Sequence, residues 1–266
     1  TQVDAENKPP LTPFTTSTEL IDKSIGCFNK LDSYFGNCLK TMSEMNHLDL
    51  ESKQGKAPGG FMYPLYEIGV PFIFMNAVGS QRDVVTMLHE GGHAVHSFLS
   101  KHLTLTEFKS TPSEVAELAS MSMELLTMDF WDVFYQDKQD LKRAKIEQLE
   151  KALEGLPWIA AIDKFQHWIY TTKHTAKQRK EKWVEINNQF GNQIVDWTGY
   201  EMALENQWQK QLHLYEVPFY YIEYGMAQLG AIAVWQNYKL NGLEAIEDYK
   251  QALKLGYTKT ISEIYK

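Results

Sequence analysis

Apolar side chains recur at every third or fourth position along most of this chain, which is the spacing that gathers them on one face of a helix. The first periodic segment begins at Thr16-Ser-Thr-Glu19, a sequence typical of a capping box at a helix N-terminus. Its apolar positions continue from Ile21 to Met45. The pattern therefore predicts one helix to about residue 46, and the polar, proline-containing residues 1–15 before it are expected to form a tail or linker.

From Ser80 onward the pattern is helical. Thr111-Pro-Ser-Glu114 predicts a second capping box, with proline at the first helical position. A kink is expected near Gly155 and Pro157, because proline lacks the amide hydrogen of a helix interior. Gly256 is expected to end the last helix. The predicted helices cover about residues 81–101, the segment that begins at Thr111, and residues 138–172, 176–190, 199–213, 219–240 and 242–255.

Two short segments between the first helix and Ser80 have a different pattern. Phe61–Tyr66 and Val70–Asn76 are rich in aromatic and branched side chains and are separated by Glu-Ile-Gly, which is typical of a β-hairpin. If Pro71–Asn76 lies at a free sheet edge, it can hold an extended peptide by main-chain pairing. The sequence thus predicts a mostly α fold with a small β-hairpin or sheet beside the helix at residues 81–101.

Composition narrows the classes of function. The 266 residues are 44% hydrophobic and 23% charged, as in ordinary globular domains. A formal charge of −8 without a basic run argues against a nucleic-acid partner. No stretch approaches the ~18 uninterrupted apolar residues of a membrane span, so we expect no membrane partner.

The cysteines and the N-terminus bear on the protein's origin. Cys27 and Cys38 match no metal or redox spacing, which indicates a reducing compartment, and the lack of a signal pattern leads us to expect a cytoplasmic protein. The chain starts at Thr1 without an initiator methionine or a signal pattern. We therefore expect it to be a fragment or processed product of a longer protein, and the sequence does not indicate an oligomeric state.

The segment His89-Glu90-Gly91-Gly92-His93 is an HExxH pattern on a predicted helix. Residues four apart lie about 40° apart around a helix axis, so both imidazoles can reach one metal ion. Glu90 projects from the same turn, where it can accept a proton from metal-bound water. The alternative is two histidines on a packed or solvated helix face. The glycines argue against it, since each costs a helix interior about 1 kcal/mol relative to alanine.

A tetrahedral metal site needs a third protein ligand. His96 lies ~10 Å along the helix axis from His89, too far for one ion to bind all three histidines of a regular helix. Glu114 is assigned to its own capping box. Glu117 lies one turn further into the next predicted helix, which a short loop would return antiparallel to the first, and it is our preferred ligand. Glu124, two turns beyond it on the same face, suits a role in orienting a ligand histidine.

These segments resemble a known family. His89-Glu-Gly-Gly-His-Ala-Val-His96 followed by Glu117-Leu-Ala-Ser120-Met-Ser-Met-Glu124 is similar to the thimet oligopeptidase and oligoendopeptidase F family of zinc metallopeptidases. The resemblance implies a zincin-like catalytic domain over residues 16–266 and one Zn²⁺ per chain. It implies His89, His93 and Glu117 as the zinc ligands and Glu90 as the general base, with Glu124 and His96 beside the ligands.

The resemblance extends to Pro218-Phe-Tyr-Tyr-Ile-Glu-Tyr224, which is similar to the family's tyrosine-rich segment. It implies His213 and Tyr224 as hydrogen-bond donors to the reaction's oxyanion. Tyr220 and Tyr221 are further candidates, and we expect aromatic core packing for at least one of them. Family members are about twice as long, and we expect the half that forms one wall of their substrate channel to be missing from this chain. That deep channel admits only unfolded chains. The resemblance therefore implies an endopeptidase whose substrates are short oligopeptides.

Two alternatives remain open at this point. Glu90–His93 and Glu44–His47 both fit the ExxH pattern of a di-iron helical bundle. That reading leaves His89 without a role and places Glu44 at the frayed end of its helix. The second alternative keeps the fold and the zinc, and treats the chain as a peptide-binding fragment with weak catalysis.

Overall fold

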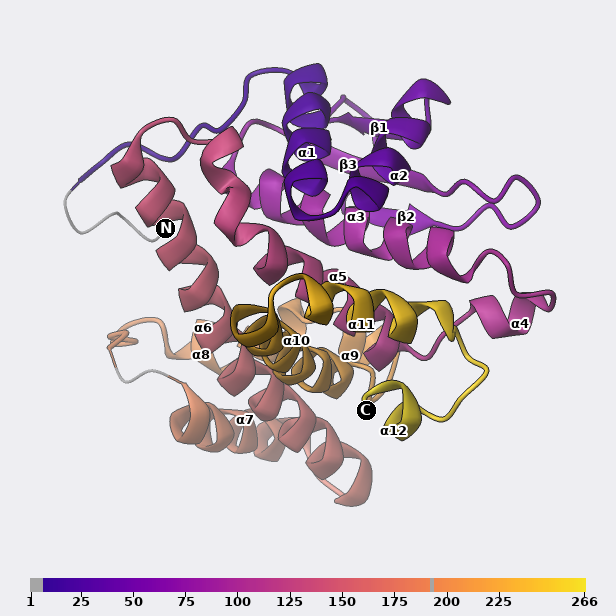
Figure 1. The fold of residues 1–266 in the computed structure, drawn as a ribbon. Coiled ribbons are helices and arrows are strands. Elements are labelled where there is room, and N and C mark those ends of the chain that lie inside the picture. Colours follow the sequence, from indigo (N-terminus) through magenta and orange to yellow (C-terminus); the bar gives the residue numbers. More distant parts are fainter. Residues whose placement is uncertain (1–6, 192–193) are drawn as a thin grey trace. The chain divides into compact units, whose positions relative to one another are not determined.

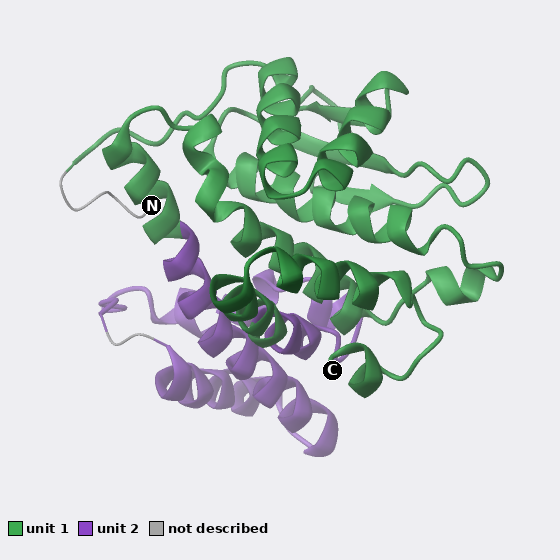
Figure 2. Cartoon of the chain, in the orientation of Figure 1, with its two compact units in different colours: residues 1–147, 229–266 green, residues 148–228 purple. Residues whose placement is uncertain are grey.

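Helices form most of the chain, as the sequence predicts, and a three-stranded sheet accompanies them (Figure 1). The structure is a computed structural model that describes residues 7–191 and 194–266. Its contacts divide the chain into two compact units (Figure 2), residues 1–147 with 229–266, and residues 148–228. We describe each unit by itself.

The first unit carries most of the secondary structure. Its helices are α1 (Ser17–Leu31), α2 (Ser33–Glu44), α3 (Gln81–Ser100), α4 (Thr106–Lys109), α5 (Ser113–Leu126), the 3₁₀-helix η1 (Thr127–Val133), α11 (Leu243–Lys254) and α12 (Ile261–Ile264). Leu11 and Phe14, which precede α1, are buried in the hydrophobic core of the first unit. Two long helices, α6 (Lys138–Thr171) and α10 (Tyr221–Asn241), cross the boundary between the units. The second unit also contains α7 (Ala176–Phe190), α8 (Glu201–Glu205), η2 (Gln207–Lys210) and α9 (His213–Glu216).

The single helix predicted over residues 16–46 is wrong, because the chain breaks at Asp32. Asp32 has an extended backbone, and its N–H donates to the carbonyl of Phe28 at the end of α1. Its side chain then accepts a hydrogen bond from the N–H of Tyr34 and so caps the start of α2. The apolar periodicity continues through the break, which explains why it concealed the boundary.

The sheet contains one strand that the pattern missed. β2 (Phe61–Tyr63) pairs antiparallel with β3 (Phe72–Ala77), which confirms the hairpin, and β1 (Leu48–Glu51) pairs parallel with the other side of β3. The strand order is β1-β3-β2, so Pro71–Asn76 is the centre of the sheet and not an edge. An added peptide cannot pair with β3, and the expectation that this strand could hold one is wrong.

Other helix ends depart from the pattern. α5 begins at Ser113 with Pro112 at the N-cap and without a side-chain capping bond, so the capping box predicted at Thr111–Glu114 is wrong. The helix predicted over residues 199–213 is divided into short pieces. α6 is continuous across Pro157. α3, α7, α10 and α11 match their predicted ranges within two residues, and Gly256 follows α11 with φ +52°.

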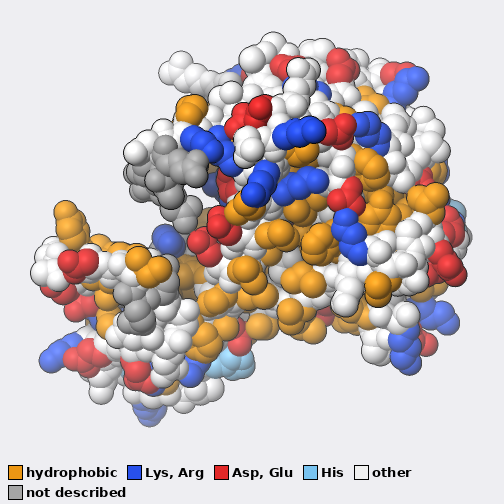
Figure 3. Space-filling view, turned by 60° about the vertical axis from the view of Figure 1, so that its left-hand side comes forward, with side chains coloured by type: hydrophobic (Ala, Val, Ile, Leu, Met, Phe, Trp, Pro, Cys, Tyr) orange, Lys and Arg blue, Asp and Glu red, His pale blue; other side chains and the backbone are white. Residues whose placement is uncertain are grey.

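On the face drawn in Figure 3, Lys and Arg side chains lie among Asp and Glu side chains. Among the described residues, none of the helices combines the length and apolar character needed to cross a bilayer.

Helix α3 packs beside the sheet (Figure 1) and against α5, and Gly92 lies where α3 and α5 approach closely. A Cβ atom at Gly92 would lie 2.7 Å from the Cα of Ser120 and 3.0 Å from the carbonyl oxygen of Ala119. Backbone atoms cannot rotate away as a flexible side chain can. The second glycine of the HExxH segment is therefore required by the contact between these two helices.

We predict that Gly92→Ala destabilises the protein by about 1–3 kcal/mol, because overpacking outweighs the better helix propensity of alanine. Gly26→Ala in α1 is the control, since nothing lies within 4 Å of a Cβ at Gly26. That variant should gain about 0.5–1 kcal/mol. Urea unfolding of both variants measures the difference, and equal stabilities would contradict the close approach.

Candidate metal centre

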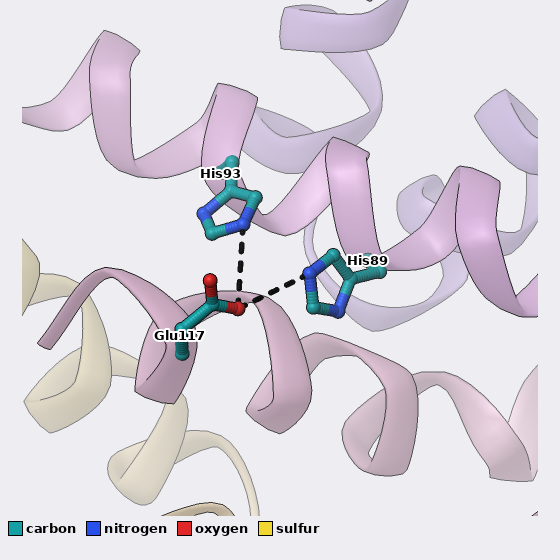
Figure 4. A group of neighbouring side chains, drawn as sticks. All are labelled: His89, His93 and Glu117. Carbon is teal, nitrogen blue, oxygen red and sulfur yellow. Dashed lines mark ion pairs between the residues drawn. The ribbon is translucent and has the colours of Figure 1, made fainter. Parts of the chain in front are cut away.

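Two histidines of α3 and one glutamate of α5 face one another (Figure 4). The Oε2 atom of Glu117 lies 3.3 Å from Nε2 of His89 and 3.7 Å from Nε2 of His93. One ligand atom from each residue lies within 4.8 Å of the other two. Within residues 7–191 and 194–266, this is the one group of three or more His, Cys, Asp or Glu side chains that could hold a metal ion.

The spacing of these atoms fits a tetrahedral ion. Ligand atoms ~2.0–2.1 Å from a tetrahedral zinc ion lie roughly 3.4 Å apart. The two separations from Glu117, 3.3 and 3.7 Å, are close to that value. Two imidazole nitrogens and one carboxylate oxygen are also a donor set that zinc binds in proteins. The residues present therefore fit the ion that the sequence predicts.

Neighbouring groups fix the orientation of the three side chains. Nδ1 of His89 lies 2.6 Å from Oε1 of Glu124, and because a carboxylate can only accept, Nδ1–H donates. This directs Nε2 of His89 toward Glu117. Ser120 donates its hydroxyl to Oε2 of Glu117 at 3.3 Å and to the Glu117 backbone carbonyl at 3.0 Å. Glu124 thus lies where the sequence predicts it, beside a histidine of the cluster.

The surroundings of His89 and His93 shift the pKa values of the two imidazoles in opposite directions. Burial alone lowers the pKa of His89, but its hydrogen bonds to Glu117 and Glu124 raise it well above the usual range. Burial, with the charge of His89, lowers the pKa of His93 to about 3. His93 is therefore a neutral imidazole at pH 7, which is the form that binds metals.

Glu90 is only 6% exposed, beside the cluster and against β2. Burial raises its pKa to about 7, which the charge of His89 and a hydrogen bond from the Met62 backbone counteract in part. A carboxyl group with a pKa near the working pH can both accept and return a proton.

The other ligand candidates lie elsewhere. His96 is buried and outside the cluster; burial lowers its pKa to about 4, and its backbone hydrogen-bond partner is Leu253 of α11. The backbone carbonyl of Glu114 accepts a hydrogen bond from the hydroxyl of Tyr265. For the di-iron alternative, Glu44 ends α2 and Nδ1 of His47 lies 3.1 Å from the carbonyl of Pro71. Neither residue joins a metal-ligating group among the described residues.

The predicted residues of the tyrosine segment gather in the second unit. The ring of His213 lies 5.9 Å from that of Tyr220, 5.0 Å from that of Tyr221 and 5.6 Å from that of Tyr224. Nε2 of His213 is 3.4 Å from the Tyr224 hydroxyl oxygen. Burial raises the pKa of Tyr221. All four residues thus form one aromatic cluster, which we call the His213 cluster.

Comparison with known proteins places this architecture in a family. The profile of peptidase family M3 matches residues 33–266. The chain belongs to peptidase family M3. An oligoendopeptidase F homolog of Borreliella burgdorferi is 25% identical over 80% of this chain and 36% of its own length. Oligopeptidase PepF of Bacillus subtilis is 24% identical over 89% of this chain and 35% of its own length.

A solved structure supports the same assignment. PZ peptidase A, solved with an inhibitor, superposes with a TM-score of 0.88 and 31% identity. The match covers 96% of this chain and 45% of PZ peptidase A. The chain therefore spans less than half the length of these M3 relatives, and the fold and the family predicted from its motifs are confirmed.

The polar partners of the His213 cluster were not predicted from the sequence. Nε2 of Gln211 lies 2.7 Å from Nδ1 of His213, and Nε1 of Trp158 lies 3.1 Å from Oε1 of Gln211. Gln211 is two residues from His213, but glutamine is common on surfaces and carries no signal by itself. Trp158 comes from α6, and only the folded chain brings it to Gln211.

Strained backbone precedes the tyrosines of the His213 cluster. Phe219 has φ +64°, a left-handed conformation that is a genuine outlier for a bulky side chain. Its ring lies 4.9 Å from that of His167 and 5.4 Å from that of Tyr170. These ring contacts hold the strained residue immediately before Tyr220.

We predict that Phe219→Gly is more stable than Phe219→Ala by roughly 1–2 kcal/mol, because both variants lose the ring but only glycine removes the strain. Glu181→Gly and Glu181→Ala, in the exposed middle of α7, are the control pair, in which alanine should be more stable by about 1 kcal/mol. Thermal unfolding compares each pair. The same order at both positions would show that residue 219 is unstrained.

Proposed function

We propose that this chain is the catalytic part of a zinc-dependent endopeptidase that hydrolyses peptide bonds in short oligopeptides. The observation that carries the proposal is the separation of the His89, His93 and Glu117 ligand atoms, which fits one tetrahedral ion. Membership of peptidase family M3 supports it. Two relatives named as oligopeptidases favour short peptides as the substrates.

His89, His93 and Glu117 would hold one zinc ion per chain. When bound through three protein ligands, zinc lowers the pKa of a water molecule to ~7 and polarises a substrate carbonyl. Glu124 holds the Nδ1–H of His89, so Nε2, once it has released its own proton, would direct a lone pair into the site. Ser120 holds the Glu117 carboxylate through its hydroxyl.

Glu90 is the general base of the proposed reaction. Its carboxylate accepts a proton from the attacking water and then delivers that proton to the leaving amine. The pKa of about 7 suits both transfers, because neither protonation state is strongly favoured at neutral pH.

Negative charge that develops on the carbonyl oxygen needs hydrogen-bond donors. We assign His213 and Tyr224 to this role, with Tyr220 and Tyr221 as further donors of the His213 cluster. The ring contacts among these residues support a shared role, since they hold the imidazole and the hydroxyl groups in one arrangement.

Glu90→Gln tests the base. We expect one zinc per chain in both proteins and a fall in hydrolysis of about 10²–10⁴-fold, because the amide cannot accept the water proton. Glu107→Gln, on the exposed helix α4, is the matched control and should hydrolyse at the wild-type rate. A fluorogenic peptide assay measures hydrolysis, and metal analysis measures the zinc content, in the wild type and in both variants. Undiminished hydrolysis by Glu90→Gln removes Glu90 from the mechanism, and a zinc-loaded wild type without hydrolysis favours the peptide-binding alternative.

Substitution of Glu124 tests the metal site without replacing a metal ligand. We expect Glu124→Ala to bind zinc about 10–100-fold more weakly, since His89 loses the acceptor that fixes its tautomer. Glu124→Gln retains an acceptor oxygen and should lose less. Competition with a chromogenic chelator measures the affinity. Equal affinities in all three proteins, or two irons per chain, would contradict the proposed site.

A further inference from the structure

The imidazole of His213 belongs to a directed series of hydrogen bonds in the second unit. Nε1 of Trp158 donates to Oε1 of Gln211 at 3.1 Å. Nε2 of Gln211 lies 2.7 Å from Nδ1 of His213, and Nε2 of His213 lies 3.4 Å from the Tyr224 hydroxyl. Every link joins residues of the same unit. The proposed mechanism assigns no role to Trp158 or Gln211.

The direction of this series follows from its first member. An indole N–H is only a donor, so the group facing it must be the carbonyl oxygen of Gln211. Turning the amide over would place two donors, Nε1–H of Trp158 and the Gln211 NH₂ group, against each other. The NH₂ group of Gln211 therefore faces His213 and donates to Nδ1.

The hydrogen bond from Gln211 determines which ring nitrogen of His213 carries a proton. A ring nitrogen that accepts a hydrogen bond carries no proton, and a neutral imidazole then has its proton on the other nitrogen. This is Nε2, on the side of Tyr224. An imidazolium has protons on both nitrogens, and its Nδ1–H would oppose the Gln211 NH₂ group.

Trp158 is well placed to keep this direction. Its ring packs edge-on against Trp183, with centroids 5.5 Å apart, and Nζ of Lys210 lies 4.4 Å from its centroid. Trp183 is fully buried in the core of the second unit. The Trp158 ring is thus in contact with a buried tryptophan and with a lysine ammonium group, which restrict its orientation.

We infer that Gln211 is a positioning residue that holds His213 as the neutral Nε2–H tautomer, with Trp158 fixing the orientation of the Gln211 amide. This inference rests on the proposed function, in which His213 donates a hydrogen bond to the oxyanion. It explains how a histidine can be a constant donor at neutral pH without becoming charged. When no oxyanion is present, the same Nε2–H can donate to the Tyr224 hydroxyl, which lies 3.4 Å away.

The test replaces Gln211 by residues of similar length and different hydrogen bonding. In Gln211→Glu the carboxylate still accepts from Trp158, but it can only accept from His213, so Nδ1 must carry a proton. Gln211→Met removes both bonds with little change of volume. The ¹⁵N shifts of the ring nitrogens in histidine-labelled protein report the tautomer directly, and His213→Gln identifies the His213 signals.

We expect the Nε2–H tautomer in the wild type, Nδ1–H or imidazolium in Gln211→Glu, and a mixture in Gln211→Met. The pH at which His213 titrates should rise in Gln211→Glu, because a carboxylate favours the charged ring. Trp158→Phe should give a mixture, since the amide can then turn over. A wild type with Nδ1–H, or spectra unchanged by Gln211→Glu, overturns the inference.

Hydrolysis separates this inference from the proposed function. With zinc bound, Gln211→Glu should lower kcat at least tenfold while KM changes little, and Gln211→Met should lie between it and the wild type. Full hydrolysis by Gln211→Glu despite a reversed tautomer overturns the role of Gln211 and leaves the proposed function standing. If the wild type hydrolyses nothing, the proposed function fails, and the ¹⁵N spectra still decide whether Gln211 sets the tautomer.

Discussion

The close contact between α3 and α5 brings the site together. Helix axes usually lie 8–10 Å apart, and histidine and glutamate are short side chains. The approach at Gly92 allows Glu117 to reach both imidazoles at 3.3 and 3.7 Å. The glycines weaken α3 by about 1 kcal/mol each as helix residues, and contacts made by the neighbouring helices offset that loss. The geometry of the cluster is therefore a property of helix packing, and the HExxH segment supplies only part of it.

Two histidines of this protein differ in the nitrogen that carries the proton, because their polar partners differ. Glu124 can only accept, so Nδ1 of His89 carries a proton and Nε2 is directed toward Glu117. The indole N–H of Trp158 can only donate, so the carbonyl of Gln211 faces it and the NH₂ group of Gln211 donates to Nδ1 of His213. Nε2 of His213 then carries the proton. The first arrangement suits a metal ligand and the second suits a hydrogen-bond donor. The same side chain serves two kinds of chemistry because its neighbours differ in donor and acceptor capacity.

The parts that could be predicted from sequence are those fixed within one helix. The i, i+4 spacing places His89 and His93 together whatever the tertiary structure is, and the amphipathic pattern of residues 81–101 gave the correct helix. The prediction of Glu117 as the third ligand required one further assumption, that a short loop returns the next helix antiparallel to the first. Asp32 was missed because the apolar periodicity continues through the break, and β1 and the central position of β3 were missed because strand neighbours depend on distant pairing partners. Gln211 was missed for the same reason, since its partner Trp158 is 53 residues away in sequence.

The ligand atoms of the His89–His93–Glu117 group come from regular helices and are held by Glu124 and Ser120, which belong to the same helix as Glu117. None of them depends on a loop that an ion would have to organise. The entropy of ordering these side chains is therefore lost when the protein folds and not when the ion arrives. Such a centre would lose and regain the proposed zinc ion without passing through an unfolded chain, so access and proton release would govern metal exchange.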